Sequence, residues 1–250
     1  MISLLSQLKV CCLYEPDSEY LVLVQDCQST EADRYRIVTW MIDVGIQAGK
    51  DHEISLVAVA IFDRFLSYAK IQTLPTKLRV IGAACMLIAS KARDNIDPYS
   101  ADILLQYGPN INSPNNYSTR DLCFWEERIR RTYNGDVNGV FAIDLVHSIL
   151  NNITLPDTVK FGIIESVKGK MIAVFTNYKY LSNCVKLLTM CCLENVYDFY
   201  SIDRHYVEEG DEERFKEEKF DIFTKPIARL LNIKLDLEYS LLYNDIILER

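Results

Sequence analysis

Apolar residues recur at helical spacing along most of the chain, and strand-like alternation is rare. One stripe occupies positions i, i+3, i+4 and i+7, namely Ile37, Trp40, Met41 and Val44. A second stripe follows Asp51, a favourable N-cap residue, and runs through Ile54, Val57, Ile61 and Phe65. From 78 to 89 only Arg79 and Gly82 interrupt the apolar character, so we expect other helices to surround this one.

Two further helices complete this first group. A short one is expected after Pro98, ending near Gly108, and the segment 108–117 is rich in Pro and Asn, which is typical of a loop. Ser118 and Asp121 then predict a capping box at the start of a helix. Its buried face is expected to hold Leu122, Trp125 and Ile129. The pattern predicts five helices with the third one buried.

The same order of elements is expected again after Asn134-Gly135, which breaks the chain. The later stripes are Phe141, Leu145 and Ile149; Val159, Ile163, Val167, Met171 and Val174; Leu181, Val185, Leu188 and Cys192; Phe220, Phe223 and Ile227; Leu235, Tyr239, Leu242 and Ile246. Two such groups predict an all-α fold with two tandem five-helix domains, each with a buried central helix. The expected boundaries are 1–32 for a short N-terminal helical segment, 33–136 for the first domain and 137–250 for the second.

Composition narrows the function classes. With 49% hydrophobic and 25% charged residues, the chain has the balance of a globular protein. A net charge of -8 argues against nucleic acid as a partner, because phosphate binding needs clustered cations. The longest apolar run, 80–89, is about half of the ~20 residues that a membrane span needs, and the N-terminus lacks the pattern of a signal peptide. We therefore expect an intracellular protein with no membrane partner.

Motifs for catalysis and for metal or cofactor binding are missing. The chain has no G-x-G-x-x-G, no phosphate-binding Gly-Lys-Ser/Thr loop, no G-x-S-x-G and no H-E-x-x-H. His52, His147 and His205 are far apart in sequence, and the eight cysteines include no C-x-x-C pair. We expect buried structural thiols, no metal, no cofactor and no catalytic site. A protein of this kind works by binding.

Four polar residues stand out in the apolar pattern: Arg34, Asp63, Lys91 and Glu126. Arg34 is expected to open the first helix, Asp63 lies near the end of the second, and Lys91 ends the buried third helix. Taken alone, such residues are usually solvated charges, and a Lys at a helix C-terminus also complements the helix dipole. Periodicity therefore favours an ordinary surface role for them.

At these residues, however, the chain resembles the cyclin box. The segments are Arg-Tyr-Arg-Ile-Val-Thr-Trp-Met at 34–41, Phe-Asp-Arg-Phe-Leu-Ser at 62–67, Gly-Ala-Ala-Cys-Met-Leu-Ile-Ala-Ser-Lys at 82–91, and Trp125-Glu126. The order and spacing of these four segments agree with the cyclin box from about 33 to 137. The second helix group resembles the cyclin C-terminal domain less closely. The first and third segments are similar to those of D-type and gammaherpesvirus cyclins, and Ser-Lys-x-Arg at 90–93 resembles the viral branch, with A-type cyclins as further relatives.

The resemblance implies a regulatory subunit that binds and activates a host cell-cycle cyclin-dependent kinase, in the nucleus or cytoplasm of the host cell. Lys91 and Glu126 match the pair that holds the loop before the kinase C helix. The kinase-binding surface implied around them comprises Ile88, Ala89, Ala92, Arg130 and Val137. Arg34 and Asp63 match a structural ion pair between the first two helices. A viral member of the family would deregulate the host cell cycle.

In the family, the first helix also forms a shallow groove for Arg-x-Leu motifs of substrates and inhibitors. The corresponding positions here are Asp33, Arg36, Ile37, Trp40, Asp43 and Arg79. Charges at Asp33, Arg36 and Arg79 replace residues that are apolar or uncharged in most cyclins, so we expect weakened docking. Ala92-Arg93-Asp94 replaces the usual Phe-Glu-Glu, so kinase preference cannot be copied from a cellular relative.

The double five-helix fold also serves transcription factors of the TFIIB type, which bind promoter DNA. That alternative predicts a basic face and an N-terminal zinc ribbon, whereas this chain is acidic and has no ribbon spacing. A general helical scaffold is a further alternative, but it leaves the four motifs in register unexplained.

Overall fold

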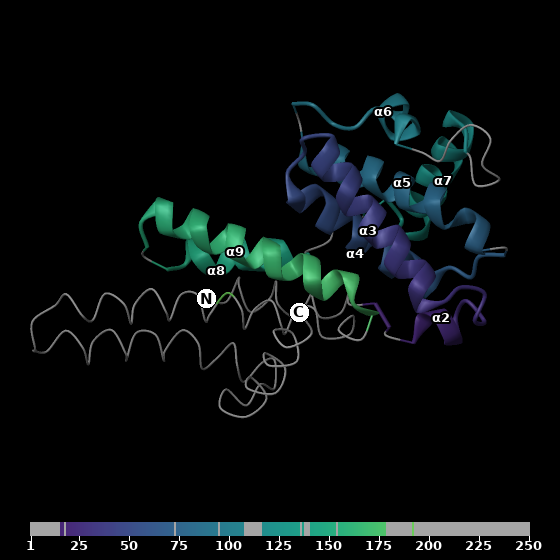
Figure 1. Ribbon diagram of the computed structural model, residues 1–250, viewed down its shortest axis with the longest axis horizontal. Helices are drawn as coiled ribbons and strands as arrows, with labels where there is room; N and C mark the ends of the chain where they lie inside the picture. Colours follow the sequence, from purple (N-terminus) through teal and green to yellow (C-terminus); the bar gives the residue numbers. More distant parts are fainter. Residues whose placement is uncertain are drawn as a thin grey trace, which may run out of the picture.

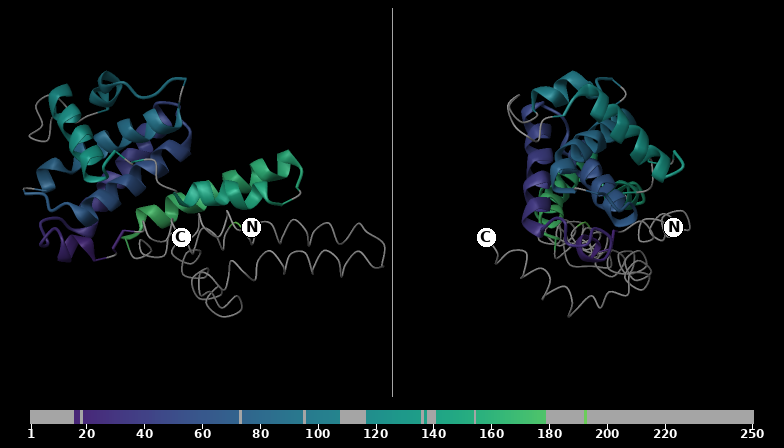
Figure 2. Two further views of the ribbon diagram at one scale, coloured as in Figure 1. Left: turned by 180° about the vertical axis from the view of Figure 1, so that it is seen from behind. Right: turned by 90° about the vertical axis from the view of Figure 1, so that its right-hand side faces the viewer.

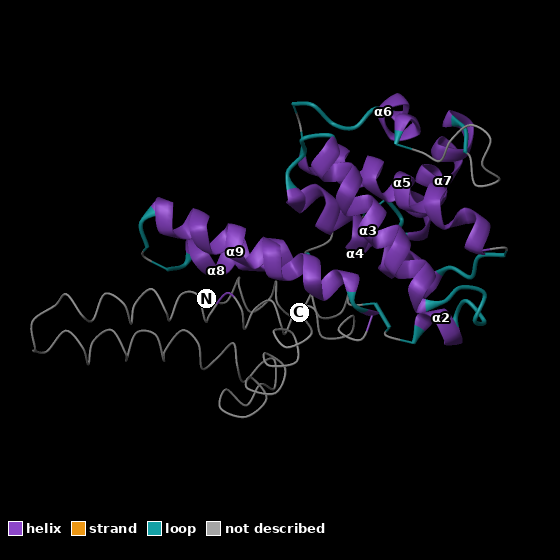
Figure 3. Cartoon of the chain, viewed as in Figure 1, coloured by secondary structure: helices purple, strands orange, loops and turns teal. Residues whose placement is uncertain are grey.

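The computed structural model describes residues 16–17, 19–72, 74–94, 96–107, 117–135, 137, 141–153, 155–178 and 192 (Figure 1). Within these ranges the secondary structure is helical and contains no strand, which confirms the all-α prediction (Figure 3). The stripes expected at 220–227 and 235–246, and that at 181–192 except for the buried Cys192, lie outside the described residues.

The described helices follow the predicted order. They are α2 (Tyr20–Leu23), α3 (Glu31–Gln47), α4 (His52–Tyr68), α5 (Leu74–Arg93), α6 (Ala101–Gln106), α7 (Thr119–Thr132), α8 (Ala142–Asn151) and α9 (Asp157–Thr176). Helices α3 to α7 are the five expected in the first domain, and α2 is the short helix expected before it. The boundaries at 32/33 and 136/137 remain a prediction.

Helix α5 is the centre of the first domain, as its sequence predicts. Every residue from 80 to 90 is buried, and α3, α4 and α7 all pack against the helix (Figure 1). A Cβ atom at Gly82 would lie 3.2 Å from the side chains of Ile37 and Met41. The missing side chain therefore allows α5 and α3 to approach each other closely.

The helix starts are determined by local side-chain caps. Asp51 accepts from the Glu53 amide, and Ser118 and Asp121 form the predicted capping box. Helix α3 begins at Glu31 and not at Arg34, so the predicted start was wrong. The reason is a second capping box, in which Asp33 N donates to Thr30 Oγ1 over 3.2 Å and Thr30 N donates to Asp33 Oδ2 over 2.9 Å.

Helices α8 and α9 lie side by side and extend away from the five-helix group (Figures 1 and 2). One end of α9 packs against α3 and α4. The predicted α9 stripe is buried at Ile163, Val167, Met171 and Val174, which confirms the helical period. No helix in the described part of the chain is both long and apolar enough to span a bilayer.

Candidate functional site

Lys91 and Glu126 meet at the surface where the end of α5 crosses α7. Lys91 Nζ donates to Glu126 Oε1 over 2.7 Å, and the two side chains are 41% and 13% exposed. Arg130, one turn further along α7, places its Nε 3.6 Å from the same Glu126 oxygen. Glu126 therefore lies between two cations, and Lys91 complements the dipole at the C-terminus of α5.

The structure divides the predicted kinase-binding residues into two groups. Lys91, Ala92 and Arg130 are exposed and Glu126 is partly exposed, so these four form a surface. Ile88, Ala89 and Val137 are only 1%, 0% and 6% exposed. Ile88 and Ala89 belong to the buried stretch 80–90 of α5, and the role of all three residues in kinase binding stays a prediction. These three side chains support the polar surface from the core.

Arg34 and Asp63 form a fully buried ion pair with two parallel bonds. Arg34 Nε and Nη2 lie 2.8 and 2.6 Å from Asp63 Oδ1 and Oδ2, and the side chains are 1% and 0% exposed. Tyr20 OH also donates to Asp63 Oδ1 over 2.8 Å, and Arg34 Nη2 donates to Phe175 O over the same distance. Burial and the Asp63 carboxylate raise the pKa of Tyr20 well above its usual value, so the hydroxyl stays a donor.

The Arg34–Asp63 pair thus connects more of the chain than the resemblance implies. It joins α3 to α4 as expected, and through Tyr20 and the Phe175 carbonyl it also reaches α2 and the end of α9. Buried charges are tolerated only when their hydrogen-bonding groups are satisfied. The pair therefore fixes where α2 and α9 sit against the first domain.

The predicted docking groove lies along α3, and several of its polar groups are engaged within the chain. Asp33 closes the Thr30 capping box and pairs with Arg36. Trp40 Nε1 donates to Tyr107 O over 3.1 Å, and the Arg79 guanidinium lies 5.1 Å from the centre of the Trp40 ring. Of the other predicted positions, Ile37 is half-buried and Asp43 is exposed.

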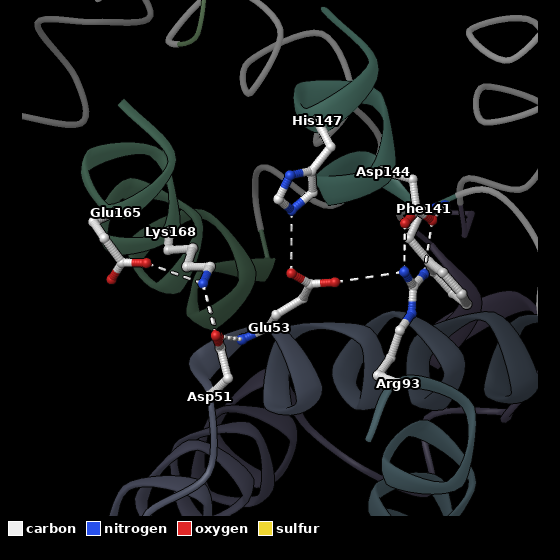
Figure 4. A network of polar contacts seen from close by, with 8 residues as sticks. All are labelled: Asp51, Glu53, Arg93, Phe141, Asp144, His147, Glu165 and Lys168. Atoms are coloured by element: carbon white, nitrogen blue, oxygen red, sulfur yellow. Dashed lines mark hydrogen bonds and ion pairs between the residues drawn. The ribbon is translucent and has the colours of Figure 1, made fainter. Parts of the chain in front are cut away.

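A polar network that sequence reasoning missed connects α4 and α5 to α8 (Figure 4). The Arg93 guanidinium donates two bonds to Asp144, of 2.5 and 2.7 Å, and lies 3.5 Å from Glu53. The hydrogen bonds to Asp144 raise the pKa of Arg93 above its already high value. Glu53 is also 3.2 Å from His147 Nε2, and the Phe141 ring covers Arg93 at 5.4 Å.

The second half of this network attaches α9 to the start of α4. Lys168 Nζ lies 2.8 and 3.0 Å from the two Asp51 oxygens and 3.0 Å from Glu165 (Figure 4). Burial alone would lower the pKa of Lys168, but these hydrogen bonds outweigh it and raise the pKa. Asp51 therefore caps α4 and holds α9 with the same carboxylate.

We expect replacement of Arg93 by Lys to lower the free energy of unfolding by about 1 kcal/mol, because Lys keeps the charge but cannot form the two-pronged bond to Asp144. Arg93→Ala should cost more than Arg93→Lys. Urea unfolding followed by circular dichroism measures both. Arg131→Lys is the matched control, since Arg131 and its partner Glu127 are both largely exposed to solvent. Equal stability of Arg93→Lys and the wild type would show that the paired geometry contributes nothing.

The network contains acidic and histidine side chains, yet its carboxylates are neutralised by Arg93 and Lys168. Among the described residues, no group of three or more His, Cys, Asp or Glu side chains could hold a metal ion. Cys85 and Cys192 are buried, as expected for structural thiols, whereas Cys27 and Cys123 are exposed and free. The contacts described so far join helices, or form a charged surface at Lys91.

A five-helix domain built around a buried third helix is the architecture of a cyclin box. The family model described as "Cyclin, N-terminal domain" matches residues 2–138, more than half of the chain. The chain therefore belongs to the cyclin family.

Individual relatives agree with this assignment. G1/S-specific cyclin-D2 of Xenopus laevis is 31% identical over 144 residues, which are 57% of this chain and 46% of that protein. Human G1/S-specific cyclin-D3 is 30% identical over 143 residues, with coverage of 57% and 46%. The chain thus spans about half the length of the curated relatives it matches.

A solved structure extends the likeness in fold. A viral cyclin from herpesvirus saimiri matches with a TM-score of 0.59 and 20% identity, covering 95% of this chain and 98% of that one. At this identity the match establishes the shared fold alone. Together with the D-type relatives, it confirms the predicted resemblance to D-type and viral cyclins.

Proposed function

We propose that this cyclin binds a cell-cycle cyclin-dependent kinase and activates it without supplying a catalytic group. The observation that carries the proposal is the Lys91–Glu126 pair, a fixed donor and acceptor on the surface of a domain in the cyclin family. Ala92 and Arg130 extend this surface. The buried residues Ile88, Ala89 and Val137 keep its backbone rigid from below.

The proposed mechanism is a shift of the kinase equilibrium. An inactive kinase holds its C-helix Glu away from the Lys that positions the ATP phosphates. A partner that binds only the inward position of the C helix stabilises the active arrangement and allows the activation loop to reorganise. Lys91 and Glu126 can do this with hydrogen bonds to a backbone segment, because each keeps unused hydrogen-bonding capacity beyond their mutual bond.

Stimulation of purified kinases tests the proposal directly. Purified protein is mixed with a panel of cell-cycle kinases, and phosphorylation of histone is measured with and without it. We expect stimulation of at least one kinase. Stimulation of none would contradict the proposed function. The panel also identifies the preferred kinase. That preference cannot be taken from cellular cyclins, because Ala92-Arg93-Asp94 replaces their usual Phe-Glu-Glu at this surface.

We further propose that the protein acts as a viral cyclin that deregulates the host cell cycle with reduced Arg-x-Leu docking. The reduced docking is supported by the groove contacts: the exposed Arg36 pairs with Asp33, so it occupies an acidic group that could otherwise accept the arginine of the motif. Arg79 is stacked on Trp40 and adds a second cation there. The guanidinium groups of Arg36 and Arg79 both repel an incoming arginine. Covering either group with the leucine of the motif would also cost desolvation free energy.

We expect an Arg-x-Leu peptide to bind the wild-type protein more weakly than micromolar. Arg36→Ile should strengthen binding by about tenfold, because it removes a cation and adds apolar surface beside Ile37. Fluorescence anisotropy with a labelled peptide measures both affinities. Arg131→Ile, an equal change on the far helix α7, is the matched control and should leave binding unchanged. Micromolar or tighter binding to the wild type would contradict the weakened groove.

A further inference from the structure

The outer face of α7 carries a hollow that the kinase-binding proposal does not use. It is a shallow, open hollow of about 640 Å³, lined by Phe124, Glu127, Arg128, Arg131 and Thr132. Phe124 is 57% exposed, although it packs edge-on against Trp125 with ring centroids 5.6 Å apart. A single exposed aromatic ring is common on protein surfaces, so the charges around this one decide whether it forms a site.

The charges around Phe124 are predominantly positive. Arg128 lies over the Trp125 ring at 4.9 Å and forms no ion pair with any side chain that the structure describes. Arg131 pairs with Glu127 over 2.6 Å, but both are largely exposed, so this pair is readily exchanged. Arg120 lies one turn before Phe124 on the same face. On this face three arginines thus outnumber two acids, Glu127 and Asp121, and the Asp121 carboxylate is already engaged by Ser118 in the capping box, in a chain with a net charge of -8.

This face is on the opposite flank of α7 from Lys91. Leu122, Trp125 and Ile129 form the buried side of the helix. Two helical positions turn a side chain by about 200°, so Glu126 and Arg128 point to opposite flanks of that buried side. Glu126 faces α5, where it meets Lys91. A ligand on the Phe124 flank could therefore bind at the same time as a kinase on the Lys91 flank.

We propose that the Phe124 face binds an acidic peptide in which carboxylates flank an apolar side chain. The apolar residue covers the Phe124 ring, and the carboxylates accept hydrogen bonds from Arg128 and Arg131, which donate well in pairs. Charge complementarity selects this ligand. A nucleic acid fits less well, because its closely spaced phosphates require a longer run of clustered cations than the three arginines on this face. Peptide binding at Phe124 needs no kinase, so it does not depend on the proposed kinase activation.

The experiment uses the full chain and a fluorescein-labelled peptide, Asp-Glu-Leu-Phe-Glu-Asp, at physiological ionic strength. We expect saturable binding by anisotropy. Phe124→Ala and Arg128→Glu should each weaken it by about tenfold or more, because aromatic and arginine side chains dominate such contacts. Phe124 is largely exposed, so its replacement leaves the core intact even where Arg128→Glu disturbs Trp125. Circular dichroism confirms that each variant is folded.

The controls separate this site from general electrostatics and from the kinase-binding surface. Arg130→Glu makes the same change of charge on the other flank of α7 and should leave peptide affinity unchanged, as should Lys91→Ala/Glu126→Ala. A peptide with Asn and Gln in place of the acids should not bind. The proposal is overturned by absence of saturable binding, by equal loss in Arg130→Glu, or by tighter binding of oligothymidylate than of the peptide.

Discussion

Replacing Lys91 and Glu126 together by Ala should reduce kinase stimulation to the level of the kinase alone, while the protein keeps its helical content. In the proposed complex, this pair supplies the donor and the acceptor that hold the kinase. Because central contacts dominate the binding free energy of an interface, we expect loss of both side chains to abolish binding and not merely to weaken it. Histone phosphorylation across a range of cyclin concentrations measures the effect, and circular dichroism measures the helical content.

The stability of this double variant is part of the expectation. Lys91 is 41% exposed, so the pair contributes about 1 kcal/mol or less to folding, and its loss cannot unfold the domain. Lys70→Ala/Asp26→Ala removes another exposed pair, which lies just before the start of α5 and so at the opposite end of that helix from Lys91, and should leave stimulation unchanged. Full stimulation by the Lys91→Ala/Glu126→Ala variant would place the kinase contact elsewhere on the chain.

Helix boundaries show which parts of the structure could be predicted from the sequence. Helix periods and caps are local, so the order of α3 to α9, the Asp51 cap and the Ser118 capping box could all be predicted from neighbouring residues. The start of α3 was missed although Thr30-Glu-Ala-Asp33 has the same spacing of a hydroxyl residue and Asp that predicted the start of α7 at Ser118 and Asp121. That signal was present in the sequence and was overlooked.

Long-range polar partners could not be predicted in the same way. No local pattern indicates that Arg93 meets Asp144, or that Lys168 reaches Asp51 across 117 positions of the chain. Such pairs depend on how α8 and α9 cross the first domain, which helix periods do not specify. The burial of Ile88 and Ala89, by contrast, follows from the apolar run at 78–89, although the resemblance places the same two residues at the kinase interface.

The network around Arg93 gives the proposed kinase-binding surface a physical connection to α8. Arg93 is two residues after Lys91 on the last turn of α5, and its guanidinium is held by Asp144 at the start of α8. The end of α5 is therefore fixed on one side by α7, through Lys91 and Glu126, and on another by α8. A rigid helix end lowers the entropy that must be lost when a partner binds there.

Replacing Asp63 by Ala should be the most destabilising single change in the first domain. It leaves the Arg34 guanidinium, 1% exposed, without its carboxylate and removes the acceptor of Tyr20. Breaking a buried pair from one side costs about 3–5 kcal/mol, a large fraction of the stability of an ordinary domain. Urea unfolding measures the loss, which we expect to be severalfold that of the Lys91→Ala/Glu126→Ala variant.

Two further variants distinguish an unpaired charge from simple loss of packing. Arg34→Met/Asp63→Leu replaces both charges with apolar side chains, so it should be more stable than Asp63→Ala alone. Arg34→Ala should also loosen the end of α9, because it removes the donor to the Phe175 carbonyl, and limited proteolysis near Thr176 reports this. If Asp63→Ala proves as stable as the wild type, the buried pair does not hold α2, α3, α4 and α9 together, and the connection must lie in the apolar contacts of Tyr20 and Phe175 instead.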